Sequence, residues 1–379
     1  MTLVEIKAKS ILRKMRRRPL QPARSGWAAS CVDSWFVSGS GMNLYRGCAH
    51  DCAYCDGRAE KYRVDGEFGS EIQVKINAVE VLRRELRRDR PGQQELWPLT
   101  SPRRGGFVLL GGGVGDSYQP VEARYRIARQ TLELLAELQI PVHVLTKSAL
   151  VLRDADVLER IARTAGALVS FSLSSADDEL SAVFEPGAAP PSERLRALAA
   201  LKDRGIAGGV FLMPVIPFVT DSARHIEATV AAAVAAGARY VLFGGMTLKQ
   251  GRQKDHFLAV LGKFRPDLLP RYAGLYPPPP EGRPDWGNAP AEYYRRVTRI
   301  FAAAARNNRV PPRIPRTLWK DVLGGNDLVR VLLDQIRELQ AMAEISLPAR
   351  PVRELTREIQ AEGTCGLYER LMSAYLPVT

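Results

Sequence analysis

The sequence lacks the long apolar runs that mark membrane-spanning helices. None of its uninterrupted apolar stretches, over 379 residues, is long enough to cross a bilayer. Its basic beginning, MTLVEIKAKSILRKMRRRPL, has no apolar core of the kind found in secretory signal peptides. We therefore expect a cytoplasmic protein without a membrane partner. Cysteines are few, five in all, and in that compartment structural disulfides are not expected.

Features of a disordered chain are also missing. Hydrophobic residues make up 46% of the sequence and charged residues 25%, which is the composition of a globular protein. The length suits one large domain with appendages, or two domains. Histidines are scarce, and the four are scattered at positions 50, 143, 225 and 256. None has a partner at helical spacing, so we assign none of them a catalytic role.

Positive charge is in excess. The chain has 54 basic and 41 acidic residues, a net charge of +13. Such an excess can attract partners that carry phosphate groups. Arginines that simply solvate helix faces are the other explanation, and charge alone does not decide between the two.

Short apolar runs alternate with helical patterns between residue 44 and residue 245. The runs are bounded by glycine or proline and are rich in β-branched residues, which predicts buried strands at 42–46, 106–113, 141–148, 167–175, 207–217 and 239–245. Amphipathic patterns predict helices at 77–88, 121–138, 154–164, 192–204 and 222–236. Each crossover is long enough for a helix that returns the chain in parallel, so we expect an α/β fold with a parallel sheet, either open or closed into a barrel.

The two ends of the chain have a different character. Residues 1–40 contain a basic run and the breaks SGWAAS and VSGSG, which favour an extension over a domain. The proline-rich stretches at 276–288 and 310–316 indicate loops, and helices are expected at 290–307, 328–343 and in RPVRELTREIQAEG. We expect three parts: the extension at 1–40, a core at 41–265, and a helical cap or lid at 266–379.

Three of the five cysteines lie in GCAHDCAYCDGR, with Cys48, Cys52 and Cys55 in a C-x-x-x-C-x-x-C spacing. A structural zinc site needs four ligands, for which His50 is the nearest extra candidate. A redox dithiol needs only Cys52 and Cys55. An electron-transfer 4Fe–4S cluster takes four cysteines, and either Cys31 or Cys365 would have to complete it. The remaining interpretation uses three sulfurs, with one iron of a cube left open for a cofactor.

The interpretation with three sulfur ligands is supported by a resemblance to a known family. The cysteine spacing and the alternating pattern after it resemble the radical S-adenosylmethionine (SAM) superfamily. Further blocks resemble its spore photoproduct lyase-like branch, namely MNLYRGCAHDCAYCDGRAEKY, LTKSALVLRDADVL, ADDELSAVFEPGAAPPSERLRAL, FLMPVIPFVTD and FGGMTLKQGRQKDHF. This resemblance implies a partial (β/α)6 TIM-type barrel of the radical SAM type, with an N-terminal extension and a C-terminal helical region.

The resemblance also implies cofactors and residues. One 4Fe–4S cluster held by the three cysteines would cleave SAM to a 5′-deoxyadenosyl radical, which takes a hydrogen atom from a substrate. The resemblance implies that Tyr54 contacts the adenine of SAM and that the glycine-rich strand end and Asp116 contact its ammonium group. Lys147 and a serine would contact the carboxylate or ribose, and an apolar strand end would line the adenine. The residues concerned are Tyr54, Gly112, Gly113, Asp116, Lys147, Ser172, Ser174 and Met213. Packing or helix capping is the alternative role for Tyr54, Asp116 and Met213.

The expected substrate is a nucleic acid or nucleotide. A basic loop with Lys249, Arg252 and Lys254 is the candidate phosphate contact. The region GGGVGDSYQP has no cysteine where the lyases have their hydrogen donor, so Tyr118 and Cys365 are the candidates in this chain. A reductant such as flavodoxin or ferredoxin is the expected protein partner. A radical enzyme for a small metabolite or nucleoside, and a zinc-stabilised nucleic-acid-binding protein without catalysis, are the alternatives.

Overall fold

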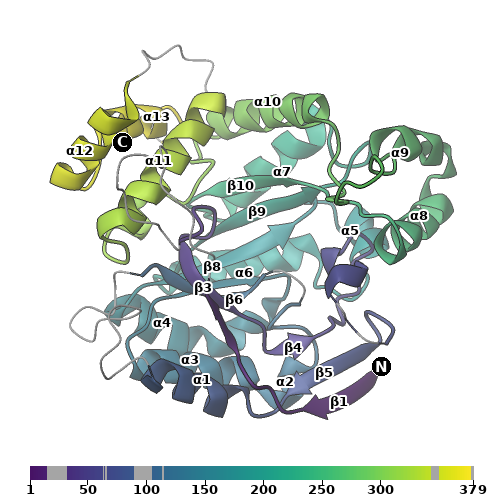
Figure 1. Cartoon of the computed structure of the whole chain (residues 1–379), viewed down its shortest axis with the longest axis horizontal. Coiled ribbons are helices and arrows are strands. Elements are labelled where there is room, and N and C mark those ends of the chain that lie inside the picture. The colour runs from purple at the N-terminus through teal and green to yellow at the C-terminus, as the bar shows by residue number, and fades with distance from the viewer. Residues whose placement is uncertain are drawn as a thin grey trace.

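The computed structural model describes residues 1–14, 32–62, 64, 66–88, 105–112, 115–342 and 350–376. A seven-stranded sheet runs through its centre, in the order β10-β9-β8-β7-β6-β3-β2 (Figure 1). Six of its strands are parallel: β3 (Ser38–Met42), β6 (Phe107–Gly111), β7 (Val142–Thr146), β8 (Ala167–Leu173), β9 (Ala207–Val215) and β10 (Val241–Gly245). The predicted partial (β/α)6 barrel is confirmed.

Helices on the outer face return the chain between these strands. They are α1 (Ala78–Arg88), α2 (Glu122–Tyr125), α3 (Ile127–Glu137), α4 (Ala155–Thr164), α5 (Asp178–Phe184), α6 (Pro191–Asp203) and α7 (Ala223–Ala235), with the 3-10 helix η3 (Ala149–Asp154) before α4. Every residue of β6 and β7 is buried, because helices cover one side and the barrel interior lies on the other. The helix expected at 121–138 is divided at Arg126, which has a left-handed φ of 54°.

The first parallel strand lies earlier than expected. It is formed by SGSGM at Ser38–Met42, which includes most of the predicted break VSGSG. Of the strand expected at 42–46, only Tyr45–Arg46 forms a separate strand, β4, and β4 belongs to the other sheet. Gly39 explains the unusual composition, since a Cβ there would overlap the carbonyl oxygen of Gly105. Glycine in this strand thus permits close approach of two backbones and is not a sign of flexibility.

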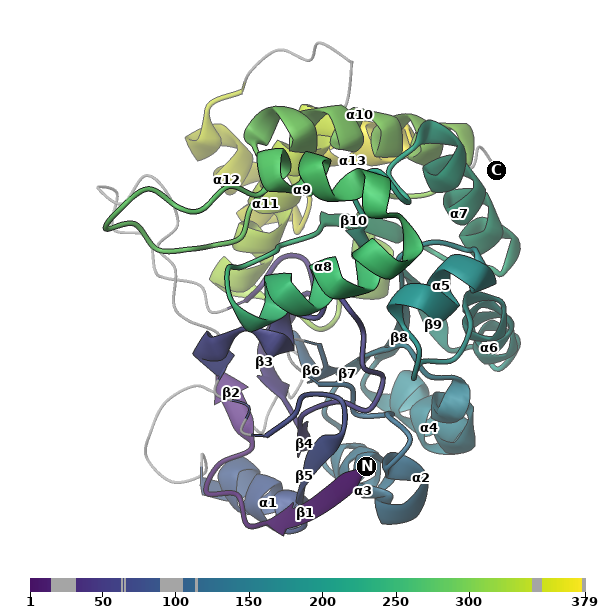
Figure 2. The ribbon, with the colours of Figure 1, turned by 90° about the vertical axis from the view of Figure 1, so that its right-hand side faces the viewer.

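The first 14 residues contribute strands to both sheets. β2 (Leu12–Lys14) pairs antiparallel with β3 at the edge of the barrel. β1 (Thr2–Ile6) pairs with β5 (Glu71–Lys75), which also pairs with β4, and these three strands form the small sheet beside the N-terminus (Figure 2). The expected boundary at residue 40 therefore falls inside β3, and the described part of 1–40 is integrated with the core.

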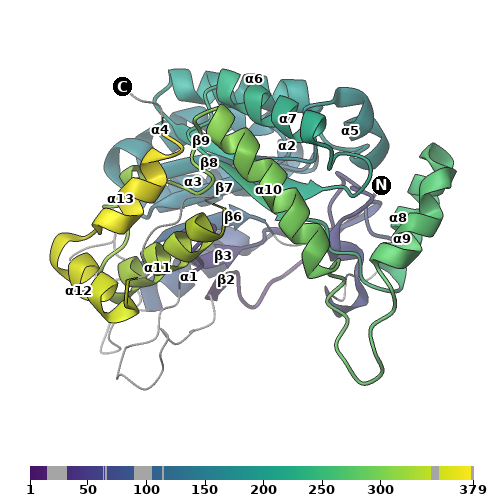
Figure 3. The same ribbon diagram turned by 90° about the horizontal axis from the view of Figure 1, so that it is seen from above.

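Helices dominate the chain after β10. They are α8 (Arg252–Phe264), α9 (Leu269–Leu275), α10 (Ala291–Asn307), α11 (Gly325–Met342), α12 (Val352–Glu362) and α13 (Gly366–Ser373). Backbone bonds from Val241 to Pro311 and from Gly106 to Val322 tie the segment before α11 to the amino ends of the strands. Figure 3 shows α11–α13 and α8–α9 at opposite ends of the sheet. Within the described parts of the chain, no helix is both long and apolar enough to cross a membrane.

We expect Gly39→Ala to lower the free energy of unfolding by about 1–3 kcal/mol, because its methyl group would force β3 away from Gly105. Gly274→Ala in α9 is the matched control, since a Cβ there meets no atom within 4 Å and alanine favours the helix. Urea unfolding followed by circular dichroism measures both. Equal stability of Gly39→Ala and the unchanged protein would contradict the close-packing explanation.

Candidate active site

The three clustered cysteines share one cavity at the carboxyl ends of the strands. Cys48, Cys52 and Cys55 all line this space, whose volume is about 350 Å³. Short backbone turns give the loop its shape, with the amide of Asp51 bonded to the carbonyl of Cys48 at 3.2 Å and that of Cys55 to Cys52 at 3.2 Å. We call this space the first cavity.

Contacts from distant parts of the chain fix the cysteine loop. The side chain of Gln119 accepts from the amide of Ala49 at 2.8 Å and donates to the carbonyl of Gly47 at 3.2 Å. Phe184 accepts from the amide of Ala53 at 2.8 Å, which joins the loop to the end of α5. Because each bond spans a long sequence separation, the sulfur positions depend on the completed fold.

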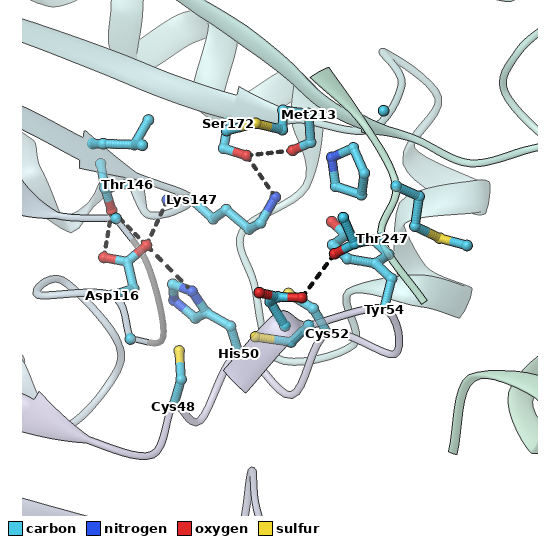
Figure 4. Close-up of a pocket in the computed structure, with 18 residues that line it drawn as sticks. Cys48, His50, Cys52, Tyr54, Asp116, Thr146, Lys147, Ser172, Met213 and Thr247 are labelled. Carbon is cyan, nitrogen blue, oxygen red and sulfur yellow. Dashed lines mark hydrogen bonds and ion pairs between the residues drawn. The ribbon is translucent and has the colours of Figure 1, made fainter. Parts of the chain in front are cut away.

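Strand ends form the opposite wall. The first cavity is lined by Gly112 and Lys147, which directly follow β6 and β7, and by Ser172 and Met213, which lie within the last three residues of β8 and β9. Such strand ends lie at the same edge of a parallel barrel. The ammonium of Lys147 donates to Ser172 Oγ at 2.9 Å, and that hydroxyl donates to the carbonyl of Met213 at 2.8 Å (Figure 4). Lys147 and Ser172 are therefore already positioned beside each other.

A buried carboxylate that the sequence did not single out holds these groups together. Glu185 is 1% exposed and accepts hydrogen bonds from Tyr54, Arg194 and, at 3.2 Å, Lys147. Burial alone would raise the pKa of Glu185, but the positive charges of Arg194 and Lys147 outweigh it and keep that pKa well below its usual range. Burial raises the pKa of the Tyr54 phenol, and the Glu185 charge adds to this.

Asp116 joins the glycine-rich end of β6 to the end of β7. Its carboxylate accepts from Thr146 Oγ1 at 2.8 Å and from the amide of Lys147 at 2.7 Å, and it lies 3.4 Å from Nδ1 of His50. Burial lowers the pKa of His50 despite this carboxylate, which favours a neutral ring. His50, to which we assigned no catalytic role, lines the first cavity together with Asp116.

The predicted phosphate-binding lysines and arginine are not brought together. Lys249 is buried and forms an ion pair with Asp56, which also accepts from Thr247 at 2.7 Å. Lys254 donates to the carbonyl of Tyr276 at 2.7 Å. Arg252 lies at a separate pocket, 3.6 Å from Glu60. Asp56 and Thr247 line the first cavity, so Lys249 reaches it only through its partners.

The two candidate hydrogen donors lie elsewhere. Tyr118 is fully buried and donates to Asp154 at 3.1 Å, and Cys365 is buried at the start of α13. Neither lines the first cavity, whose described lining contains no thiol besides the three clustered cysteines. Ser174 is buried outside that lining as well. Gly113 and Cys31 lie outside the described residues.

The donor set fits an iron–sulfur cluster with a bound cofactor. Burial raises the pKa of all three thiols, so a bound cation is needed to hold them as thiolates. Lys147 offers a cation and Ser172 a hydroxyl on the facing wall, while Met213 and Pro214 offer apolar surface. In the part of the chain that the structure describes, no three Cys, His, Asp or Glu side chains are grouped to hold a single metal ion.

Comparison with known proteins identifies the class. A model of the radical SAM superfamily matches residues 42–233, just over half of the chain. An uncharacterized protein of Mycobacterium tuberculosis is 31% identical over 281 residues, which cover 73% of this chain and 78% of that protein. An uncharacterized protein of Methanocaldococcus jannaschii is 26% identical over 57% of this chain and 74% of its own length.

The structural comparison agrees with this result. A solved structure of spore photoproduct lyase complexed with dinucleoside spore photoproduct has a TM-score of 0.56, covers 81% of this chain and 79% of the lyase, and is 14% identical. At that identity the likeness establishes the fold. The chain belongs to the radical SAM superfamily and has the fold of its spore photoproduct lyase-like members. It is thus an enzyme of a class that uses SAM and an iron–sulfur cluster.

We expect Glu185→Gln to lower the free energy of unfolding at neutral pH by about 3–5 kcal/mol, because Arg194 would remain buried without a counter-charge. Glu159→Gln is the control, since the pairs of Glu159 with Arg163 and Arg204 lie at the surface and contribute little to stability. Urea unfolding measures both variants.

The same pair predicts a pH dependence. The folded-state pKa of Glu185 lies below its ordinary value of 4.5, so the unfolded chain takes up a proton there that the folded protein does not. Its stabilisation is therefore present above about pH 5 and decreases as the pH falls further. The stability of Glu185→Gln should fall less steeply on acidification than that of the unchanged protein, and parallel curves would contradict this assignment.

Proposed function

We propose that this protein uses Cys48, Cys52 and Cys55 to hold a 4Fe–4S cluster beside SAM and acts on a nucleic-acid or nucleotide-like substrate in a lyase-like reaction. The observation that carries the proposal is the single cavity on which three thiols and the strand-end Lys147 meet. When bound, the two cofactors supply a 5′-deoxyadenosyl radical that abstracts a hydrogen atom from the substrate.

The chain's own residues bind and orient in this proposal. Lys147 and Ser172 are suited to the carboxylate and ribose of SAM, because ammonium and hydroxyl groups donate to such oxygens. Glu185 holds the Lys147 ammonium in place and keeps Tyr54 against the cysteine loop. Met213 and Pro214 provide the apolar wall that adenine needs. Asp116, already bonded to Thr146, sets the relative position of the β6 and β7 ends.

The substrate class is supported by charge and by the structural relative. The chain carries a net charge of +13, and the relative was solved with a dinucleoside in place. Low-potential electrons for the cluster would come from a protein such as flavodoxin or ferredoxin. The hydrogen atom that ends the reaction would come from a group other than Tyr118 or Cys365, since neither lines the first cavity.

The cluster can be tested without a substrate. We expect the anaerobically reconstituted protein to be brown with about four irons per chain, and Cys48→Ala, Cys52→Ala and Cys55→Ala each to lose most of that iron. Cys365→Ala, which removes a buried thiol that does not line the first cavity, is the control and should keep its iron. A colourless protein with stoichiometric zinc would instead support the alternative from the sequence, a zinc-stabilised nucleic-acid-binding protein without catalysis.

Lys147→Met should bind SAM about 10- to 150-fold more weakly than the unchanged protein, the range expected when one charge-assisted hydrogen bond is lost. The readout is the change that added SAM causes in the electron paramagnetic resonance spectrum of the reduced cluster. Lys254→Met removes a lysine that bonds only outside the first cavity and should leave SAM binding unchanged. Equal SAM affinity of the Lys147 variant and the unchanged protein would remove Lys147 from the cofactor site.

A further inference from the structure

A large aromatic side chain stands exposed near the first cavity. Trp286, in the loop between α9 and α10, is 63% exposed, although large apolar side chains of the described residues are mostly buried. Its loop is well anchored, with Asp285 accepting from the amides of Gln250 at 2.6 Å and Gly287 at 2.8 Å. The amide of Leu248, three residues after the end of β10 and next to Thr247 of the cavity lining, donates to the carbonyl of Gly287 at 2.7 Å.

Cations and aromatic rings alternate from this tryptophan towards β2. The ammonium of Lys61 lies 6.0 Å from the ring centre of Trp286 and 4.8 Å from that of Tyr62. The Tyr62 hydroxyl donates to Asp56 at 2.7 Å, and Asp56 lines the first cavity. Arg13 lies in β2 at the edge of the barrel, opposite Gly41 of β3. Burial raises the pKa of Tyr62, and the charge of Arg13 partly offsets this effect. We call Arg13, Lys14, Tyr62, Lys61 and Trp286 the rim strip.

A second cavity opens at the β2 end of the strip. Its volume is about 910 Å³, Arg13 and Lys14 line it, and it shares Gly112 with the first cavity. The acidic residues of its lining have other partners: Asp33 accepts from the amide of Trp35, Asp334 pairs with Arg330, and Glu338 pairs with Arg313. The described lining holds five basic and three acidic side chains, and no described residue forms an ion pair with Arg13 or Lys14, so this end of the strip is positively charged.

We propose that the rim strip binds a single-stranded nucleic acid, with one base stacked on Trp286 and its backbone along Lys61, Arg13 and Lys14, so that a neighbouring nucleotide faces the first cavity. Alternating cations and exposed rings are how single strands are bound without sequence readout, because each base has a face to stack and each nucleotide a phosphate. This inference rests on the proposed function for the chemistry in the first cavity, but the binding surface can be tested separately.

The test measures fluorescence anisotropy of a labelled oligothymidylate of about 12 nucleotides, within the site sizes of small single-strand-binding domains, with the full-length reconstituted protein. Trp286→Ala should weaken binding about 5- to 150-fold, the range for loss of one aromatic–base stack, and Trp286→Phe should retain most of it. Lys61→Ala should also weaken binding and should reduce the slope of log affinity against log salt by about one, whereas Trp286→Ala should leave the slope unchanged.

Arg163→Ala is the matched charge control, since it removes an exposed cation from α4 on the outer helical layer. Affinity of Trp286→Ala within twofold of the unchanged protein, or an equal loss for Arg163→Ala, would overturn the proposal. The proposal would also be overturned if the protein bound a duplex more tightly than the single strand and Trp286→Ala did not weaken that binding. If oligouridylate of the same length binds through the same residues, this supports the rim strip as the binding surface. If it also binds more tightly than oligothymidylate, RNA is the preferred strand.

Release of 5′-deoxyadenosine, measured on the same samples with SAM and dithionite, separates the two proposals. If the protein releases this product but the strip variants bind normally, the radical function stands and the strip does not. If the strip variants lose binding while no variant releases the product, the nucleic-acid surface stands and the radical function fails.

Discussion

One buried carboxylate connects the parts of the site. Glu185 follows α5, yet it bonds Tyr54 of the cysteine loop, Lys147 at the end of β7 and Arg194 of α6. Because the charge is fully buried, these partners must all be in place for it to be stable. The cysteine loop, a strand end and an outer helix therefore take up their relative positions together.

Charged groups around the first cavity have partners before any cofactor arrives. Lys147 pairs with Glu185, Lys249 with Asp56, and Asp116 accepts from Thr146 and from the backbone. Side chains that are held in this way lose little conformational freedom when a ligand binds, and their donors keep a fixed direction. The basic residues that remain available lie outside the cavity, where a polyanion can reach them.

Most of the barrel could be predicted because its strands are apolar runs with clear ends. The exception is β3, where close contact between backbones requires glycine, and the residues SGSGM therefore look like a break. The cysteine cluster was predictable from its spacing and the family resemblance, and Lys147, Ser172 and Met213 from that resemblance and because a parallel barrel brings its strand ends together. The role of Glu185 was not predictable, although Glu185 lies in the block ADDELSAVFEPGAAPPSERLRAL, because a position after a short helix gives no sign that its side chain reaches the cavity wall. Lys249 had the expected charge, but its pairing with Asp56 depends on the fold. The placement of Tyr118 and Cys365 away from the cavity depends on tertiary packing too.

The antiparallel strand β2 affects how the molecule behaves among its own copies. An incomplete barrel leaves the backbone of its first parallel strand free to pair, and such an edge is a template for sheet extension between molecules. Here Leu12–Lys14 occupies that position on β3 and places two cations, Arg13 and Lys14, along it. A short, charged strand from the expected extension thus covers the backbone edge of β3, and this disfavours sheet extension between copies of the protein.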